Sequence, residues 1–235
     1  MQRREPLFDR VSILIPVYNN AETLQQLVAQ VKSATQPVAR HTQFVFVNDA
    51  STDSSASVLD RIASEDILII ENKENLGQQA SIRIGLNACD GQAVIVMDAD
   101  LQDPPEAIPD LLTLLHSGDY DAVFATRVGV YQSYWRMMNS HIFRFLIRRI
   151  TNLPHGAGGF VAITNNVAAH LAQKRGSRFY LAGMIGCHNY RIAAIPMARN
   201  LRATGKSEYT PTMRISLAFS NFIFVFTERI SRGKK

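Results

Sequence analysis

Four times in its first half, the chain passes from a short apolar run to a polar loop and then to a helical pattern. The apolar runs are too short for helices and are predicted as strands over residues 11–17, 44–47, 67–70 and 93–97. Because parallel strands are joined by crossover helices, this rhythm predicts an α/β fold with a doubly wound, mostly parallel sheet. The polar loops after the strands then open on one edge of the sheet.

The second half departs from this rhythm. Strands are predicted over 122–125, 160–163 and 191–196, and helices over 134–150, 166–174 and 211–229. The first and last of these helices are amphipathic. The most apolar stretch of the last one, ISLAFSNFIFVF, has only twelve residues, which favours an interfacial or buried helix over a membrane span.

The fourth strand leads into the sequence VIVMDADLQDPP, at residues 94–105. Asp98, Asp100 and Gln102 follow one another at alternate positions, so their oxygen atoms are expected on one side of an extended loop. Such hard oxygen ligands suit Mg²⁺ or Mn²⁺ held jointly by the protein and a substrate diphosphate. The alternative for so short a motif is an acidic turn after a strand.

Charge divides the chain into two unlike halves. Residues 1–125 contain 8 Lys and Arg against 18 Asp and Glu, whereas residues 126–235 contain 17 against 2. The acidic half suits a metal site, and the basic half suits an anionic partner such as phosphate groups or a membrane surface. We expect no nucleic acid partner, because no helix-turn-helix, zinc-finger or RNP-like pattern accompanies the positive charge.

Six motifs occur in order, each in its expected element, and together they resemble the inverting, GT-A type family 2 glycosyltransferases. Within that family the likeness is to the branch that contains dolichyl-phosphate mannose synthase and bacterial polyprenyl-phosphate glycosyltransferases. The motifs are IPVYNN (15–20), VNDASTD (47–53), NLGQQA (75–80), MDADLQDPPE (97–106), ATR (125–127) and RATGKSEY (202–209).

The resemblance implies a nucleotide-sugar donor, with a UDP-sugar favoured over a GDP-sugar. Asp49 would bind the base or ribose, and a simpler role for it or for Ser51 is to cap the following helix. Many family members carry an acid where this chain has Asn48. The residues assigned to the donor are Pro16, Tyr18, Asn20, Asp49, Gly77 and Gln78.

The resemblance also assigns the catalytic and metal-binding residues. Asp98, Asp100 and Gln102 would hold Mg²⁺ or Mn²⁺, which neutralises charge on the departing nucleoside diphosphate. Arg127 would add hydrogen bonds to the phosphates through its guanidinium group. The catalytic set is therefore Asp98, Asp100 and Arg127.

The chemical nature of the acceptor is predicted from the absence of acidic residues in the second half of the chain. Transfer to a hydroxyl needs a general base, yet residues 122–207 contain no Asp or Glu. A phosphate acceptor is already anionic and needs positive charge instead, which favours a polyprenyl phosphate. By resemblance, the residues that would bind it are Arg136, Ser140, Arg202, Ser207 and Tyr209.

One stretch departs from the family pattern. Relatives in the polyprenyl-phosphate branch usually read DAGDFR, where this chain reads GAGGFV at 156–161. Two alternatives therefore stay open. One is transfer to a saccharide hydroxyl in surface-polysaccharide synthesis, with His155 as the base. The other is a non-catalytic homologue that binds nucleotide-sugar.

Three regions are expected along the chain: a nucleotide-sugar and metal-binding half over 1–130, an acceptor-binding half over 131–210, and an interfacial helix with a basic tail over 211–235. The protein is expected to be cytoplasmic and to contact the inner face of the cell membrane peripherally. Because many relatives carry spanning helices after this domain, either a membrane-protein partner or further chain would complete the anchor. A single sugar transfer is expected.

Overall fold

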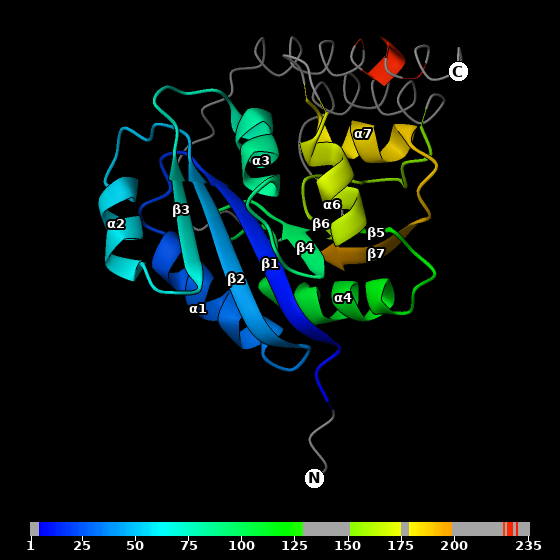
Figure 1. Cartoon of the computed structure of the whole chain (residues 1–235), viewed down its shortest axis with the longest axis horizontal. Helices are drawn as coiled ribbons and strands as arrows, with labels where there is room; N and C mark the ends of the chain where they lie inside the picture. Colours follow the sequence, from blue (N-terminus) through cyan, green and yellow to red (C-terminus); the bar gives the residue numbers. More distant parts are fainter. Residues whose placement is uncertain are drawn as a thin grey trace.

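A seven-stranded sheet with the order β3-β2-β1-β4-β6-β5-β7 forms the centre of the molecule (Figure 1). The computed structural model describes residues 5–128, 151–174, 179–198, 223, 225–227 and 229, with the backbone alone for Arg127 and Val128. The strands are β1 (Phe8–Val17), β2 (Ala39–Asn48), β3 (Ile67–Glu71), β4 (Ala93–Val96), β5 (Ala122–Val128), β6 (Val161–Thr164) and β7 (Ile192–Ala198).

The sheet is mostly parallel, which confirms the predicted doubly wound arrangement. Strand β1 pairs in parallel with both β2 and β4, and β2 pairs in parallel with β3. Strand β6 runs antiparallel between β4 and β5, while β5 and β7 are parallel. The carboxyl ends of β1 to β5 therefore lie at one edge of the sheet.

Helices cover both faces of the sheet (Figure 1). They are α1 (Leu24–Thr35), α2 (Ser55–Ile62), α3 (Gln78–Leu86), α4 (Ile108–His116), α6 (Asn165–Ala172) and α7 (Leu181–Cys187), with a 3-10 turn η1 (Pro105–Ala107) before α4. Alternate residues of β1 face the two sides: Ile13 and Ile15 pack with α1 and α4, and Leu14 packs with α3. This alternation gives the sheet two buried faces.

One helix was not predicted from the sequence, and two predicted helices lie wholly or mostly outside the described residues. Helix α7 lies in a stretch where no element was predicted. The predicted helix over 134–150 lies outside the described residues. So does most of the one over 211–229, although residues 223, 225–227 and 229 are helical. Among the described residues, no helix is both long and apolar enough to cross a membrane.

Both cysteines are free thiols. Cys187 is buried, and Cys89 is largely buried. Burial raises the pKa of the Cys89 thiol to about 12, so this thiol stays protonated at neutral pH. Both side chains fill the apolar layer on the α3 side of the sheet.

Candidate active site

The polar motif loops converge at the carboxyl edge of the sheet because they follow neighbouring strands. The Asp49 amide donates to the carbonyl of Val17 over 2.8 Å, and the Asn72 amide donates to the carbonyl of Asn48 over 2.9 Å. Each bond joins the loop after one strand to the end of the next strand. The four loops thus form one continuous rim, at the place where open α/β sheets bind their ligands.

The acidic loop after β4 alternates between buried and partly exposed residues. Ala99, Leu101 and Asp103 are buried, at 3%, 6% and 4% exposure. Asp98, Asp100 and Gln102, between them, are all partly exposed. The three predicted metal ligands are therefore the accessible residues of the loop, although the chain turns at residues 99–100 and does not run extended as predicted.

Internal hydrogen bonds hold the shape of this loop. The Asp98 amide donates to Asp103 Oδ2 over 3.2 Å, and the Gln102 amide donates to Asp100 Oδ1 over 3.2 Å. Leu101 adopts a left-handed backbone conformation, with φ of 60°. Asp103 was given no role from the sequence, yet its buried carboxylate closes the turn that presents Asp98.

The donor set suits a hard divalent cation. In the part of the chain that the structure describes, no three His, Cys, Asp or Glu side chains gather as a complete metal site. Mg²⁺ commonly takes one or two carboxylates and fills its other positions with water and substrate phosphates. Asp98 and Asp100, with the Gln102 amide oxygen, fit that partial coordination.

Gln78, the first residue of α3, contacts Asp98 directly. Its Nε2 donates to Asp98 Oδ1 over 2.5 Å, which fixes the orientation of the carboxylate. Gly77 precedes it with φ of 85°, a conformation that side chains disfavour. The glycine therefore permits the turn that brings Gln78 to Asp98.

Asp49 is buried, at 3% exposure, and accepts three hydrogen bonds from the loop between β3 and α3. The donors are the Asn72 side chain at 2.8 Å, the Leu76 amide at 2.9 Å and the Gly77 amide at 2.8 Å. Its observed contacts hold the loop that carries Gly77 and Gln78. Binding of a base or ribose by Asp49 stays a prediction.

The alternative prediction for Asp49 and Ser51, that one of them caps α2, is wrong. The N-cap residue of α2 is Ser54, and it makes no side-chain cap hydrogen bond. Asp49 instead contacts the next loop along the sheet edge, and the Ser51 hydroxyl donates to Asn48 Oδ1 over 2.5 Å. Asn48 in turn donates through Nδ2 to Glu71 Oε2 over 2.7 Å.

Asp53 and Asn19, which the sequence did not single out, join the first two motif loops. Asp53 accepts from the amides of Ser55 at 2.9 Å and Ala21 at 3.1 Å. Burial raises the pKa of Asp53, but these hydrogen bonds outweigh that effect and leave it below its ordinary value. Asn19, with φ of 54°, accepts at Oδ1 from the amides of Thr52 and Asp53.

The remaining predicted donor residues lie on or beside β1. Pro16 is buried in the strand opposite Val47. Tyr18 and Asn20 are partly exposed at the sheet edge, where the Tyr18 amide donates to Asn20 Oδ1 over 3.2 Å. Tyr18 and Asn20 therefore lie at the rim, whereas Pro16 lies buried within strand β1.

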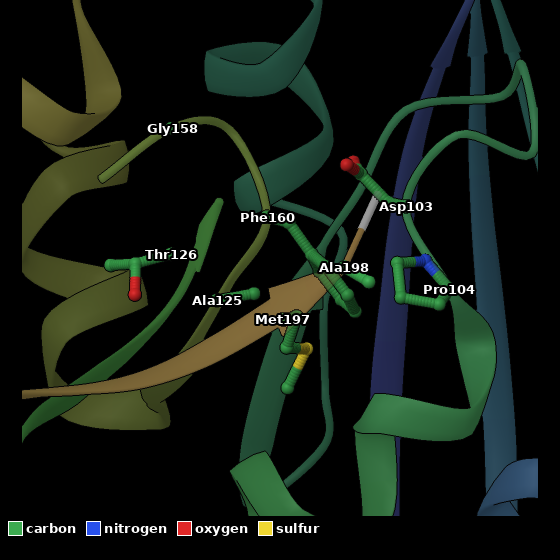
Figure 2. Close-up of a pocket in the computed structure, with 8 residues that line it drawn as sticks. All are labelled: Asp103, Pro104, Ala125, Thr126, Gly158, Phe160, Met197 and Ala198. Carbon is green, nitrogen blue, oxygen red and sulfur yellow. The ribbon is translucent and has the colours of Figure 1, made fainter. Parts of the chain in front are cut away.

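The glycine-rich stretch before β6 lies beside the acidic loop. A Cβ built on Gly159 would lie 3.7 Å from Asp98 Oδ1. Next to it is a pocket lined by Asp103 and Pro104 on one side and by Ala125 and Thr126 on the other (Figure 2). Gly158, Phe160, Met197 and Ala198 complete its lining. His155, the proposed base for a hydroxyl acceptor, is exposed to solvent.

Several predicted residues are not described. Arg127 lies in β5, where its backbone is paired with Met197, and its side chain is outside the description. The residues predicted to bind the acceptor all lie outside the described residues: Arg136, Ser140, Arg202, Ser207 and Tyr209. Their roles stay predictions.

The parallel sheet and the acidic rim define an α/β domain whose ligands bind outside the carboxyl ends of the strands. Comparison with known proteins identifies the family to which this domain belongs. Residues 12–174 match Glycosyl transferase family 2, and the chain belongs to that family.

Two relatives of similar sequence carry the same name. An undecaprenyl-phosphate 4-deoxy-4-formamido-L-arabinose transferase from Pseudomonas savastanoi pv. phaseolicola is 34% identical over 218 residues, which cover 89% of this chain and 63% of that protein. The protein of the same name from Serratia proteamaculans is 32% identical, over 88% of this chain and 60% of that protein. This chain thus spans about three fifths of the length of these relatives.

Solved structures confirm the predicted GT-A fold. Glucosyl-3-phosphoglycerate synthase from Mycobacterium tuberculosis, in complex with UDP, superposes with a TM-score of 0.65 at 14% identity, over 92% of this chain and 80% of that one. A mannosyltransferase from Pyrobaculum calidifontis, in complex with GDP-Man and Mn²⁺, has a TM-score of 0.58 at 15% identity, over 94% and 75%. At these identities the likeness extends to the fold alone.

Proposed function

We propose that the protein is a metal-dependent, inverting glycosyltransferase that transfers one sugar from a nucleotide-sugar to a polyprenyl phosphate. Family membership and the name shared by its relatives support this proposal. The observation that carries it is the acidic loop, in which Asp98, Asp100 and Gln102 share the accessible side while Gln78 orients Asp98. That arrangement is suited to a cation shared with a diphosphate.

The residues at the sheet edge are proposed to bind the donor. Asp98, Asp100 and Gln102 would hold Mg²⁺ or Mn²⁺, as Mn²⁺ is held in the complexes of two structural neighbours. When bound, the cation acts as a Lewis acid that neutralises charge on the leaving diphosphate. Asp49 keeps the loop of Gly77 and Gln78 in place, and Arg127 would bind the phosphates.

The transfer itself needs no general base on the acceptor. An oxygen of the acceptor phosphate forms a bond to the anomeric carbon while the bond from that carbon to the nucleoside diphosphate breaks. The acceptor oxygen is already deprotonated at neutral pH, which agrees with the absence of Asp and Glu from residues 122–207 of the sequence. Arg136, Ser140, Arg202, Ser207 and Tyr209 are the residues proposed to bind the acceptor.

The setting is proposed to be the cytoplasmic face of the membrane, with peripheral attachment. The basic second half of the chain would contact anionic lipid, and a membrane-protein partner would contribute to anchoring. A UDP-sugar is the favoured donor.

Transfer tests this function directly. The protein is incubated with Mn²⁺, a panel of UDP-sugars and GDP-sugars, and undecaprenyl phosphate in vesicles, and lipid products are identified by mass spectrometry. We expect one sugar on the lipid phosphate, and no product after chelation of the metal. The metal site is tested with the variant Asp100→Asn. Its matched control is Asp110→Asn, because Asp110 lies in helix α4 outside the acidic loop.

Two results would contradict the proposal. Sugar found only on an added oligosaccharide would show a hydroxyl acceptor. Mn²⁺-dependent nucleotide binding by calorimetry, without transfer to any lipid or saccharide, would show a non-catalytic homologue.

A further inference from the structure

Thr23 stands at the position that caps helix α1, yet its hydroxyl group makes its shortest contact elsewhere. Thr23 is the N-cap residue of α1, and its side chain accepts no capping hydrogen bond from the described first turn of that helix. A threonine at an N-cap commonly accepts such a bond. The Thr23 hydroxyl instead donates to the carbonyl of Ala99 over 2.6 Å, across 76 positions of the chain. The side chain therefore joins two distant segments.

This contact is buried on both sides. Thr23 is 5% exposed, and Ala99 is 3% exposed. The Thr23 hydroxyl also lies 3.1 Å from the carbonyl of Asn20. A hydroxyl has a single proton to donate, and the shorter distance favours Ala99 as its acceptor. Loss of this donor is costly, because a buried carbonyl cannot replace it with bulk water.

The Ala99 carbonyl belongs to the turn that carries the predicted metal ligands. Ala99 lies between Asp98 and Asp100, and the chain turns there before Leu101, whose φ is 60°. The side chains of Ala99 and Leu101 belong to the apolar cluster that includes the buried face of α1. The turn is thus held against α1 by its apolar side chains and by the hydrogen bond from Thr23.

The other end of this contact is the loop after β1, which is predicted to contribute to donor binding. The Asn20 amide donates to Ser55 Oγ over 2.9 Å, and the Ala21 amide donates to Asp53 Oδ2 over 3.1 Å. These bonds hold the loop against the one that follows β2. The loop after β1 is therefore fixed at one side by residues 53–55, and Thr23 connects it to the acidic loop at the other.

We propose that Thr23 is a positioning residue for the divalent cation. Its hydroxyl holds the Ala99 carbonyl and so fixes the turn that presents Asp98 and Asp100. The same bond keeps the loop after β1 and the acidic loop at a set distance, which aligns the cation with the diphosphate of the nucleotide. This inference rests on the proposed function, because it concerns the metal site assigned there.

Two substitutions separate the hydroxyl group from the volume of the side chain. Thr23→Val has almost the same shape without the hydroxyl, whereas Thr23→Ser keeps the hydroxyl and loses a methyl group. Mn²⁺ binding is measured from the electron paramagnetic resonance signal of the free ion, alone and with UDP or GDP. We expect Thr23→Val to weaken Mn²⁺ binding about tenfold, the lower end of the range for residues that support metal ligands. Thr23→Ser should stay within about threefold of the wild type, because the donor is retained.

Thr35→Val is the matched control in the same helix. Thr35 is buried, at 1% exposure, and its hydroxyl donates to the Val31 carbonyl over 3.0 Å. This variant should lower the melting temperature without changing the affinity for Mn²⁺. An equal loss of Mn²⁺ affinity in Thr35→Val would show a general effect of destabilisation and would overturn the proposal.

Hydrogen exchange tests the turn in the absence of metal. In Thr23→Val, amides of residues 98–103 should exchange faster than in the wild type, while those of β2 should not change. Unchanged exchange at residues 98–103 would refute the role of Thr23.

The failure of this inference and that of the proposed function give different results. A wild-type protein that binds no Mn²⁺, with or without UDP or GDP, would refute the metal site of the proposed function and this inference with it. A wild-type protein that binds Mn²⁺, together with a Thr23→Val variant that binds it equally well, would refute the role of Thr23 alone.

Discussion

The sheet edge proposed to bind the donor (the donor edge) and the half of the chain proposed to bind the acceptor (the acceptor half) are built by different kinds of contact. At the donor edge, polar side chains such as the buried Asp49 and the partly exposed Asn19 accept hydrogen bonds from neighbouring loops. In the described part of the acceptor half, Gly183 and Gly186 let segments pack directly on α7. The donor edge is shaped by polar contacts between loops, while the described part of the acceptor half depends on close apolar packing.

The largest effect should come from removing a metal ligand at the donor edge. Asp100→Ala should lower kcat by about a thousandfold, because loss of the metal's interaction with the leaving group removes about 4 kcal/mol. The melting temperature should change little, since Asp100 is partly exposed and contributes little to the core. Activity and thermal unfolding are measured together, and wild-type turnover in this variant would disprove the metal assignment.

Removing the polar support of the donor edge should affect stability as well as binding. Asp49→Ala removes the acceptor of the Leu76 amide and of the Asn72 side chain and leaves the Gly77 amide with Asn75 Oδ1 alone, which should lower the free energy of unfolding by about 3 kcal/mol. The donor KM should rise because Gln78 is no longer held. Asp49→Asn retains one acceptor oxygen and should show a smaller loss in urea unfolding. Equal stability of all three proteins would show that these hydrogen bonds contribute nothing.

Disturbing the packing of the acceptor half should change the KM for the acceptor and not the KM for the donor. Gly186→Ala places a Cβ 2.6 Å from Leu153 Cγ and should destabilise the protein by about 2 kcal/mol. The acceptor KM should rise while the donor KM stays constant. Gly85→Ala is the comparison in the donor half, where the Cβ would lie 2.1 Å from Leu14 Cδ1. If both variants changed the same KM, the two halves would not be separable.

The smallest effect is expected far from both substrates. Arg191 donates hydrogen bonds to Asp121 through its side chain, with Nη2 2.9 Å from Oδ1, and through its backbone amide. These hydrogen bonds hold the pKa of Asp121 below its ordinary value. A lowered pKa stabilises the folded state above the unfolded value of about 4, and this stabilisation is lost as the pH falls through the folded value. Asp121→Asn should therefore lower the melting temperature slightly at pH 7 and hardly at all near pH 3. Neither KM should change, and a change in either would link this ion pair to the site.

Much of the donor edge was predictable because its signals are local. Asp98, Asp100 and Gln102 are the more exposed residues of their loop, although the chain turns at residues 99–100, with Leu101 left-handed, where an extended loop was predicted. The capping role predicted for Asp49 or Ser51 failed for a different reason. Asp49 accepts hydrogen bonds from residues 72–77, which follow another strand, and no local pattern indicates such a contact.

Helix α7 shows what sequence periodicity cannot reveal. A helix that is buried all round has no polar face, so Leu181–Cys187 gives no amphipathic pattern. Its two glycines also lower helix propensity, although close packing requires them. The antiparallel direction of β6 was equally hidden, because a strand of four apolar residues reads the same for either direction of pairing.

The position of β5 in the sheet has a consequence for synthesis of the chain. Its neighbours, β6 and β7, are both made after it, whereas β1 to β4 can pair among themselves once residue 96 has left the ribosome. We therefore expect the nascent chain to form a four-stranded intermediate first, with β5 exposed until residues 161–198 emerge. A translational pause placed after residue 128 would prolong that exposure and increase aggregation.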